Sequence, residues 1–343
     1  MHPEMSLVFL TVFAGVGQGI FITLVILDAL FGTTGNLSPQ FTLAAGIISL
    51  AFPVLGMAAS FFHLGNPQRG WKAIKMWKQS WLSREVIFLP AFLAMDALYL
   101  FLFYMQADGT LRLFAGFMGI IAAVGLYISS AMLYAAIRYV REWANAFTPL
   151  NFTLFGLTSG TAVILAVCQF TSIHPRIEAG LVNLVAFLAS FSLVLKALAF
   201  QHNGNIYSPL SLKNALGINA PHIKLRDTGC AYETYNTIEY HFPMTASQQT
   251  LHQALTLIVA FFLPLLVALM VSVNPVMPVK TPLIIVCALL NIGGLIIERR
   301  LFFTQGNHLQ NLYYGNYRIT GAKNPLASSA RPGVPVPRTV QQE

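Results

Sequence analysis

Two protonatable side chains, His63 and Glu85, fall at the facing ends of two consecutive apolar segments. Histidine titrates near neutrality, and a desolvated glutamate can relay protons. A quinone site needs such groups at the membrane boundary, because the quinone ring stays in lipid while two protons must reach it. A structural explanation stays open from the spacing alone. A histidine at a helix end can cap carbonyl groups, and a glutamate in a first turn is favoured by the helix dipole.

The elements that must position these residues are eight apolar segments. Each is close to or above the length of about 20 residues that spans a bilayer as a helix. With 56% hydrophobic and only 9% charged residues, the chain lies outside the range of soluble globular proteins. We therefore predict an all-α, polytopic membrane protein with two four-helix bundles side by side. The predicted spans cover residues 5–30, 41–62, 86–105, 111–137, 152–170, 177–200, 250–271 and 282–303.

The basic residues are distributed asymmetrically across the predicted membrane. We call side A the side that holds the N-terminus. Of the 20 lysines and arginines, all but Arg112, Arg176 and Lys280 fall on side A. The positive-inside rule then predicts that both termini are cytoplasmic, in the inner membrane of a bacterium. The formal charge of +8 favours contact with membrane lipids or an acidic partner over nucleic acid.

Aromatic residues gather on the same side. All four tryptophans fall at side A boundaries, where amphipathic rings anchor helices. Between the second and third spans, Trp71, Ile74 and Trp77 share one arc of a helical wheel, which predicts a short helix lying in the membrane interface.

The domain organisation is simple. Residues 1–317 form the predicted eight-helix membrane domain, with a long side A insert at 201–249. Loops much longer than about 12–15 residues are usually functional or docked to a partner. Residues 318–343 contain several prolines without apolar periodicity, which indicates a flexible tail.

Cysteine and histidine usage argues against resident redox centres. The three cysteines form no C-x-x-C pair, whereas an iron–sulfur cluster needs about four thiolates. The eight histidines fall at span ends, in loops or in the tail, so no pair is predicted to face each other across a haem. We expect neither haem nor an iron–sulfur cluster in this chain. If the protein handles electrons, a partner must supply them.

Three stretches resemble the anchor subunit of the dimethyl sulfoxide reductase family. The first runs from His63 to Arg69 and continues from Ser80 to Glu85. The second leads from Arg141 and Trp143 to glycines 156 and 160, and the third begins at Glu298. The resemblance implies an eight-helix subunit without its own redox centre. Such a subunit anchors a four-cluster iron–sulfur subunit and a molybdopterin catalytic subunit, and exchanges electrons with the quinone pool.

The resemblance also assigns residues. The family's quinol-site histidine and glutamate match His63 and Glu85, so the quinone reaction is expected here and the substrate reaction on a partner. Arg69 and Ser83 are predicted to help bind quinone. If side A is cytoplasmic, the catalytic subunits are cytoplasmic too. This arrangement resembles the sulfite-oxidising branch, which passes electrons from sulfite to ubiquinone or menaquinone. The alternative is a menaquinol-oxidising anchor of a dimethyl sulfoxide reductase-type enzyme.

A different class of protein also stays open. Asp28 and Asp96 fall inside predicted spans, and ionisable residues there are candidates for a transport pathway. An ion or proton transporter is therefore a further alternative. The competing explanation for Asp96 is a hydrogen bond between helices. Gly15 and Gly19 are spaced for close helix packing.

Overall fold

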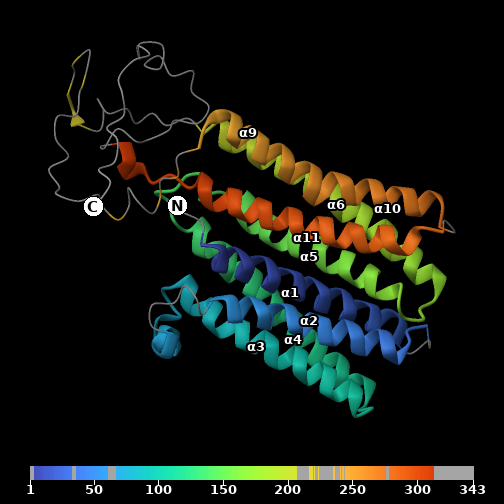
Figure 1. The fold of residues 1–343 in the computed structure, drawn as a ribbon. Coiled ribbons are helices and arrows are strands. Elements are labelled where there is room, and N and C mark those ends of the chain that lie inside the picture. The colour runs from blue at the N-terminus through green and yellow to red at the C-terminus, as the bar shows by residue number, and fades with distance from the viewer. Residues whose placement is uncertain are drawn as a thin grey trace, which may run out of the picture.

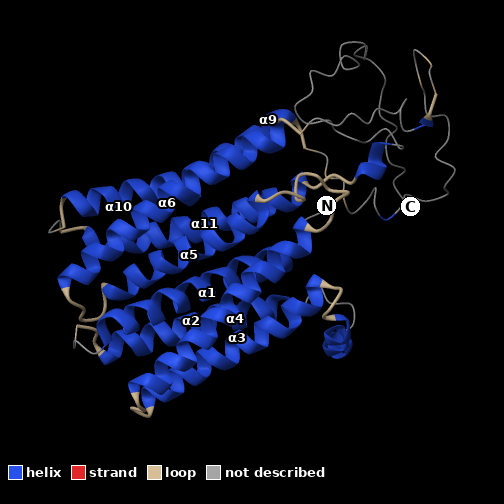
Figure 2. Ribbon diagram, turned by 180° about the vertical axis from the view of Figure 1, so that it is seen from behind, coloured by secondary structure: helices blue, strands red, loops and turns tan. Residues whose placement is uncertain are grey.

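The architecture is all-α, as predicted (Figures 1 and 2). This computed structural model describes residues 4–32, 36–60, 67–206, 216–218, 220, 223, 235, 240, 242, 244–275 and 278–312. For residues 67–70 it describes the backbone alone. Eight helical spans in these ranges are long and apolar enough to cross a membrane. They are α1 (Met5–Phe31), α2 (Pro39–Ser60), α3 (Trp81–Tyr104), α4 (Gly109–Ala135), α5 (Phe147–Cys168), α6 (Pro175–Gly204), the continuous Ala246–Val273 and α11 (Lys280–Gln305).

The spans form two bundles that pack against each other. The first bundle consists of α1 to α4, and the second consists of α5, α6, α11 and the Ala246–Val273 span. Helices α1 and α5 make the main contact between the bundles. These two helices are also the most enclosed, since 78% and 72% of their central apolar stretches are buried inside the protein. Helix α3 lies at the edge of the molecule, and only 17% of its central apolar stretch is buried.

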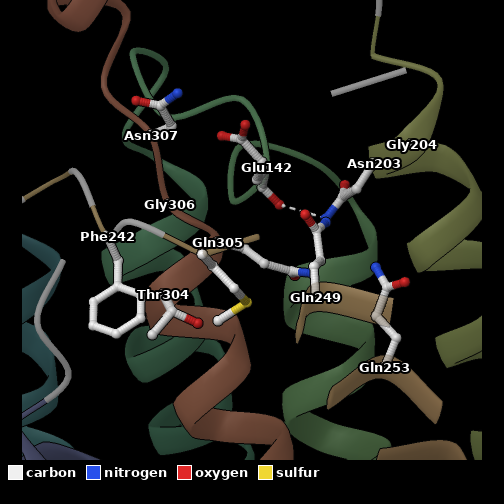
Figure 3. A pocket seen from close by; sticks show the side chains of 11 residues that line it. Glu142, Asn203, Gly204, Phe242, Gln249, Gln253, Thr304, Gln305, Gly306 and Asn307 are labelled. Atoms are coloured by element: carbon white, nitrogen blue, oxygen red, sulfur yellow. Dashed lines mark hydrogen bonds between the residues drawn. The ribbon is translucent and has the colours of Figure 1, made fainter. Parts of the chain in front are cut away.

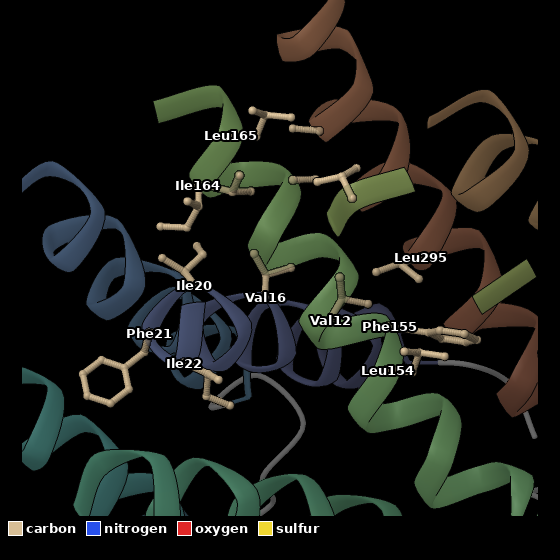
Figure 4. Close-up of a cluster of buried hydrophobic side chains, with 14 of the residues drawn as sticks. Val12, Val16, Ile20, Phe21, Ile22, Leu154, Phe155, Ile164, Leu165 and Leu295 are labelled. Atoms are coloured by element: carbon tan, nitrogen blue, oxygen red, sulfur yellow. The ribbon is translucent and has the colours of Figure 1, made fainter. Parts of the chain in front are cut away.

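Small residues let α1 and α5 approach closely. A Cβ atom added to Gly19 would collide with the backbone of Gly156, and one added to Gly160 would collide with the backbone of Gly19. Glycine is therefore required on both faces of this contact. Above and below the glycines, apolar side chains of α1, α5 and α11 fill the space, including Val16 and Leu295 (Figure 4). The predicted role of Gly19 in close packing is confirmed.

Polar side chains cap the N-termini of two of the spanning helices. Asp108 caps α4 by accepting the backbone N–H groups of Thr110 and Leu111 at 2.9 and 3.3 Å. A hydrogen bond with the side chain of Thr110, together with these two backbone bonds, lowers the pKa of the Asp108 carboxyl. Thr245 and Gln248 form a reciprocal capping box that begins the seventh span.

The seventh span is not a uniform α-helix. It consists of α9 (Ala246–Leu255), the π-helical η3 (Thr256–Phe262) and α10 (Leu263–Val273). Pro264 has no N–H group, so the carbonyl of Ala260 loses its usual helical donor. The side-chain amide of Asn291 in α11 donates to that carbonyl at 2.6 Å. A neighbouring helix thus satisfies the backbone group that proline leaves open inside the membrane.

The segment before α3 is helical, as predicted, but it is a 3₁₀ helix, η2 (Pro67–Met76). Trp71, Ile74 and Trp77 are exposed on it or directly after it. Trp143 differs from the prediction. It is 1% exposed, and its indole N–H donates to the carbonyl of Phe302 at 2.8 Å. It is a core residue where α11 ends, because the loop after α4 folds inward over that helix.

Most of the predicted 201–249 insert and the whole 318–343 tail lie outside the described residues. The described part of the chain contains no strand, only an isolated bridge between Leu37 and Ile173. The N-terminal end of α3 and the C-terminal ends of α2, α4 and α11 lie at one end of the molecule (Figure 1). We keep the name side A for that end.

Candidate functional site

The structure describes two of the four predicted site residues with their side chains. Ser83 and Glu85 lie in the first two turns of α3. His63 lies outside the described residues, and Arg69 belongs to η2 without a described side chain. That all four meet in one site therefore stays a prediction.

Ser80 determines where α3 begins. Its side-chain oxygen accepts the backbone N–H of Ser83 at 3.4 Å, and its backbone is extended, as is typical of an N-cap. The helix therefore starts at Trp81, five residues before the predicted 86. Ser83 is only 2% exposed, and Glu85 becomes part of the spanning helix.

Glu85 is held by the neighbouring helix. Its Oε1 atom accepts a hydrogen bond from the hydroxyl of Ser130 in α4 at 2.6 Å. The side chain is half-buried in the chain. Tyr134 lies one helical turn beyond Ser130 on α4. A carboxyl that enters the membrane region needs such partners, since an isolated charge there is costly.

Arg84 fixes the approach to α3. Its guanidinium donates to the carbonyls of Trp77 and Lys78, both at 3.0 Å, and lies 4.0 Å from the centre of the Trp81 ring. These contacts join the turn after η2 to the first turn of α3. The motif residue Arg84 thus has a structural role in the site's geometry, which was not predicted from the sequence.

A second group of charged side chains lies in the other half of the molecule. Lys196 of α6 donates to Glu298 Oε1 of α11 at 2.5 Å, and the two side chains are 5% and 1% exposed. Arg299 Nε lies 3.6 Å from Glu298 Oε2, and its guanidinium stacks 3.7 Å from the centre of the Phe152 ring. We call these three residues the buried charge cluster.

The buried charge cluster was not predicted from the sequence. Lys196 and Arg299 were counted among the basic residues of the side A face, but both are buried at 4% exposure. Both still lie near the side A ends of their helices, but they are not part of an exposed basic face. The signal that could have revealed them was a lysine inside the sixth span and a Glu-Arg pair near the end of the eighth.

A pocket opens at the side A end of the same helices (Figure 3). About 50 Å³ of it is open to water-sized molecules. Glu142 lies at its upper end beside Asn307, while Gln249, Gln253 and Thr304 lie lower down. Burial raises the pKa of Glu142 to about 7, although its own backbone N–H and that of Asn307 donate to it.

Asp28 and Asp96, which made a transporter an alternative interpretation, both have hydrogen-bond partners on other helices. Ser49 of α2 lies 2.9 and 3.1 Å from the two carboxyl oxygens of Asp96 in α3. Asp28 accepts two bonds from Arg112, each at 2.9 Å, and a third from the Tyr99 hydroxyl at 2.9 Å. Each pair or triad joins different helices, so both aspartates hold the first bundle together.

The predicted absence of metal centres concerns the whole chain, and the structure addresses part of it. Within the described ranges, no three His, Cys, Asp or Glu side chains come together as metal ligands would. Cys168 and Cys287 are buried free thiols, and Cys230 lies outside those ranges.

The fold and these sites define a multi-pass integral membrane protein with acidic and basic groups gathered at one end. The profile of the DMSO reductase anchor subunit (DmsC) family matches residues 1–315, so the chain belongs to that family. It is a membrane anchor subunit of an oxidoreductase complex, which implies catalytic and iron–sulfur partner subunits. A protein of Allochromatium vinosum that is named as a sulfite dehydrogenase subunit is 30% identical to it over 335 residues, covering 92% of this chain and 99% of the relative.

Proposed function

We propose that this subunit exchanges electrons between an iron–sulfur partner and quinone, at a site that contains Glu85 and His63. The observation that carries the proposal is the carboxyl of Glu85, which enters the membrane at side A and is bonded to Ser130 at 2.6 Å. A proton-carrying group at this depth can meet a quinone ring in lipid and still receive protons from water. Arg69 and Ser83 are proposed to help bind the ring.

The proposed electron donor is sulfite, oxidised on a molybdopterin subunit and passed on through a four-cluster iron–sulfur subunit. Two observations support this direction. The relative from Allochromatium vinosum is named as part of a sulfite dehydrogenase. The basic residues that border side A also favour a cytoplasmic location for the partners, in the inner membrane of a bacterium. Electron flow from quinol to a reducible substrate is the competing outcome.

The test uses the native complex in its membrane. We expect that His63→Ala and Glu85→Gln each lower sulfite-dependent quinone reduction by about a hundredfold, the lower range for loss of a general acid or base. Activity with a water-soluble artificial electron carrier should remain, because that reaction bypasses this subunit.

The matched control is Glu4→Gln, which changes an exposed glutamate on side A that makes no side-chain cap bond. It should leave both activities unchanged. Normal quinone reduction by both site variants would return His63 and Glu85 to structural roles. A complex that reduces no quinone with sulfite but oxidises quinol with another substrate would favour the reductase anchor.

A further inference from the structure

The buried charge cluster carries polar atoms that the protein itself does not satisfy. Among the described residues, Glu298 Oε2 and the Nε and Nη1 atoms of Arg299 have no hydrogen-bond partner. The hydroxyl of Thr256 on η3 is 0% exposed and is likewise without one. Buried polar atoms of native proteins are nearly always paired, and ordered water supplies the partner where side chains do not. These atoms therefore indicate water inside the second bundle.

Thr256 and Glu298 lie at the same depth. A Cβ atom added to Gly294 of α11 would collide with the backbone of Ala260, so these two positions are directly apposed. The helices run antiparallel. Four residues toward side A from each position lead to Glu298 on α11 and to Thr256 on the seventh span. Thr256 and Glu298 thus lie in one layer across the two helices, and Arg299, the next residue on α11, faces Phe152 of α5.

Polar residues continue from this layer to the Glu142 pocket on three helices. Asn203 lies seven residues beyond Lys196 on α6, and Gln305 lies seven residues beyond Glu298 on α11. Seven residues are about two turns, or about 10 Å, along the same helix face. Both Asn203 and Gln305 line the pocket.

The seventh span completes the arrangement. Gln249, Gln253 and Thr256 follow at intervals of four and three residues, so they share one face of the helix. The two glutamines line the pocket, and Thr256 reaches the layer of Glu298. η3 packs against both α6 and α11, so Thr256 lies on the element that contacts the helices of Lys196 and Glu298. A water molecule needs about 10–15 Å³ of open volume, so the pocket has room for a few.

The cluster is in turn connected to the candidate quinone site. The ring of Tyr134 on α4 stacks on Phe152 with 5.9 Å between the ring centres, and Arg299 covers the same Phe152 ring. Ser130, the hydrogen-bond partner of Glu85, lies one turn away from Tyr134 on the same helix.

We propose that water molecules and side chains carry protons from side A, through the Glu142 pocket and the buried charge cluster, to Tyr134 and Glu85. This inference rests on the proposed quinone reaction. Reduction of quinone consumes two electrons, which the iron–sulfur partner supplies, and two protons. Each proton that leaves Glu85 for a quinone oxygen is replaced by one that enters the chain at the pocket. Both protons are thus taken from side A, and none has to cross the membrane.

The test uses two variants of the native complex. Thr256→Val keeps the size of the side chain and removes only the unpaired hydroxyl, so it does not strand a charge. Glu298→Gln removes the carboxylate from the cluster. We expect Glu298→Gln to slow sulfite-dependent quinone reduction by about tenfold or more, and Thr256→Val to act in the same direction. In both variants the solvent deuterium isotope effect should increase, because proton supply becomes rate-limiting. Activity with the artificial electron carrier should not change.

Glu178→Gln provides the matched control. Glu178 also pairs with a lysine of α11, Lys280 at 2.6 Å, but this pair lies at the opposite end of the same bundle. It should show a normal rate and isotope effect. The route is overturned if Thr256→Val and Glu298→Gln leave rate and isotope effect unchanged, or if Glu178→Gln reproduces their effects. A wild-type complex that exchanges no electrons with quinone would instead overturn the proposed function itself.

Discussion

Glu142 carries a buried carboxyl group outside the membrane-spanning helices. Only 8% of the residue is exposed, and its Oε2 atom has no hydrogen-bond partner among the described residues. The pKa is raised from 4.5 to about 7, mainly by desolvation, while Arg141 acts weakly in the opposite direction. Between these values the folded protein holds a proton that the unfolded chain has released. The contribution of Glu142 to stability is therefore greatest below about pH 4.5 and falls as the pH rises to about 7.

The Glu142→Gln variant should lack this pH dependence. A glutamine stays neutral, so the variant should gain stability relative to the wild type between pH 5 and pH 8, by about 1–3 kcal/mol. The measurement is the difference in melting temperature between variant and wild type in detergent, at both pH values. A difference that is the same at pH 5 and pH 8 would contradict the assigned cause.

At the scale of helices, the bond from Asn291 to the Ala260 carbonyl compensates for Pro264. We predict that Asn291→Leu lowers stability by about 1–2 kcal/mol, the range for polar contacts between membrane helices. In a Pro264→Ala background the same change should cost less, because residue 264 then supplies a backbone N–H to Ala260. Thermal unfolding of the four proteins in this double-mutant cycle measures the difference.

The cycle separates this bond from a second effect. Asn291 also has a buried Oδ1 atom without a partner among the described residues, and its removal by Leu is favourable in both backgrounds. An equal cost of Asn291→Leu with Pro264 and with alanine at 264 would show that the bond does not replace the missing helical donor.

Hydropathy predicted all eight spans, since length and apolar composition alone decide which helices cross a bilayer. The boundaries were less accurate. The third span begins at Trp81 and not at 86, because the Ser80 cap extends the helix through polar residues that a hydropathy window excludes. The buried charge cluster could not be predicted from local sequence. Its lysine and glutamate are 102 positions apart, and they meet only because α6 and α11 both pack against α5 and η3.

The Glu85 site was predictable in part. The sequence placed Glu85 directly before an apolar run, so a carboxyl near the side A end of the third span could be predicted. No sequence pattern indicates Ser130, which approaches Glu85 only through the packing of α3 on α4. Trp143 illustrates the opposite error. Its position beside a span suggested a membrane anchor, but the loop that carries it folds onto α11.

For the whole molecule, the alternation of eight spans brings the site-bearing helix ends to side A. Lys196 and Arg299 do not contribute to the exposed basic face. Lys72 and Lys75 on η2 and Lys78 directly after it are exposed at side A, and Arg84 lies in the first turn of α3. We predict that a reporter fused after Glu343 is active only in the cytoplasm, because positive residues are retained on that side. Activity confined to the periplasm would reverse the assignment and remove one support for sulfite oxidation.

The peripheral position of α3 has a kinetic consequence. Only 17% of its central apolar stretch is buried by the rest of the chain, so this helix borders the bilayer along much of its length. A hydrophobic molecule that diffuses in the plane of the membrane can therefore collide with the Glu85 end of α3 sideways, without traversing a channel. The quantity that governs such encounters is the mole fraction of that molecule among the lipids. Its concentration per litre of buffer has no direct meaning for the rate, and added lipid dilutes the substrate even when the volume of the sample is constant.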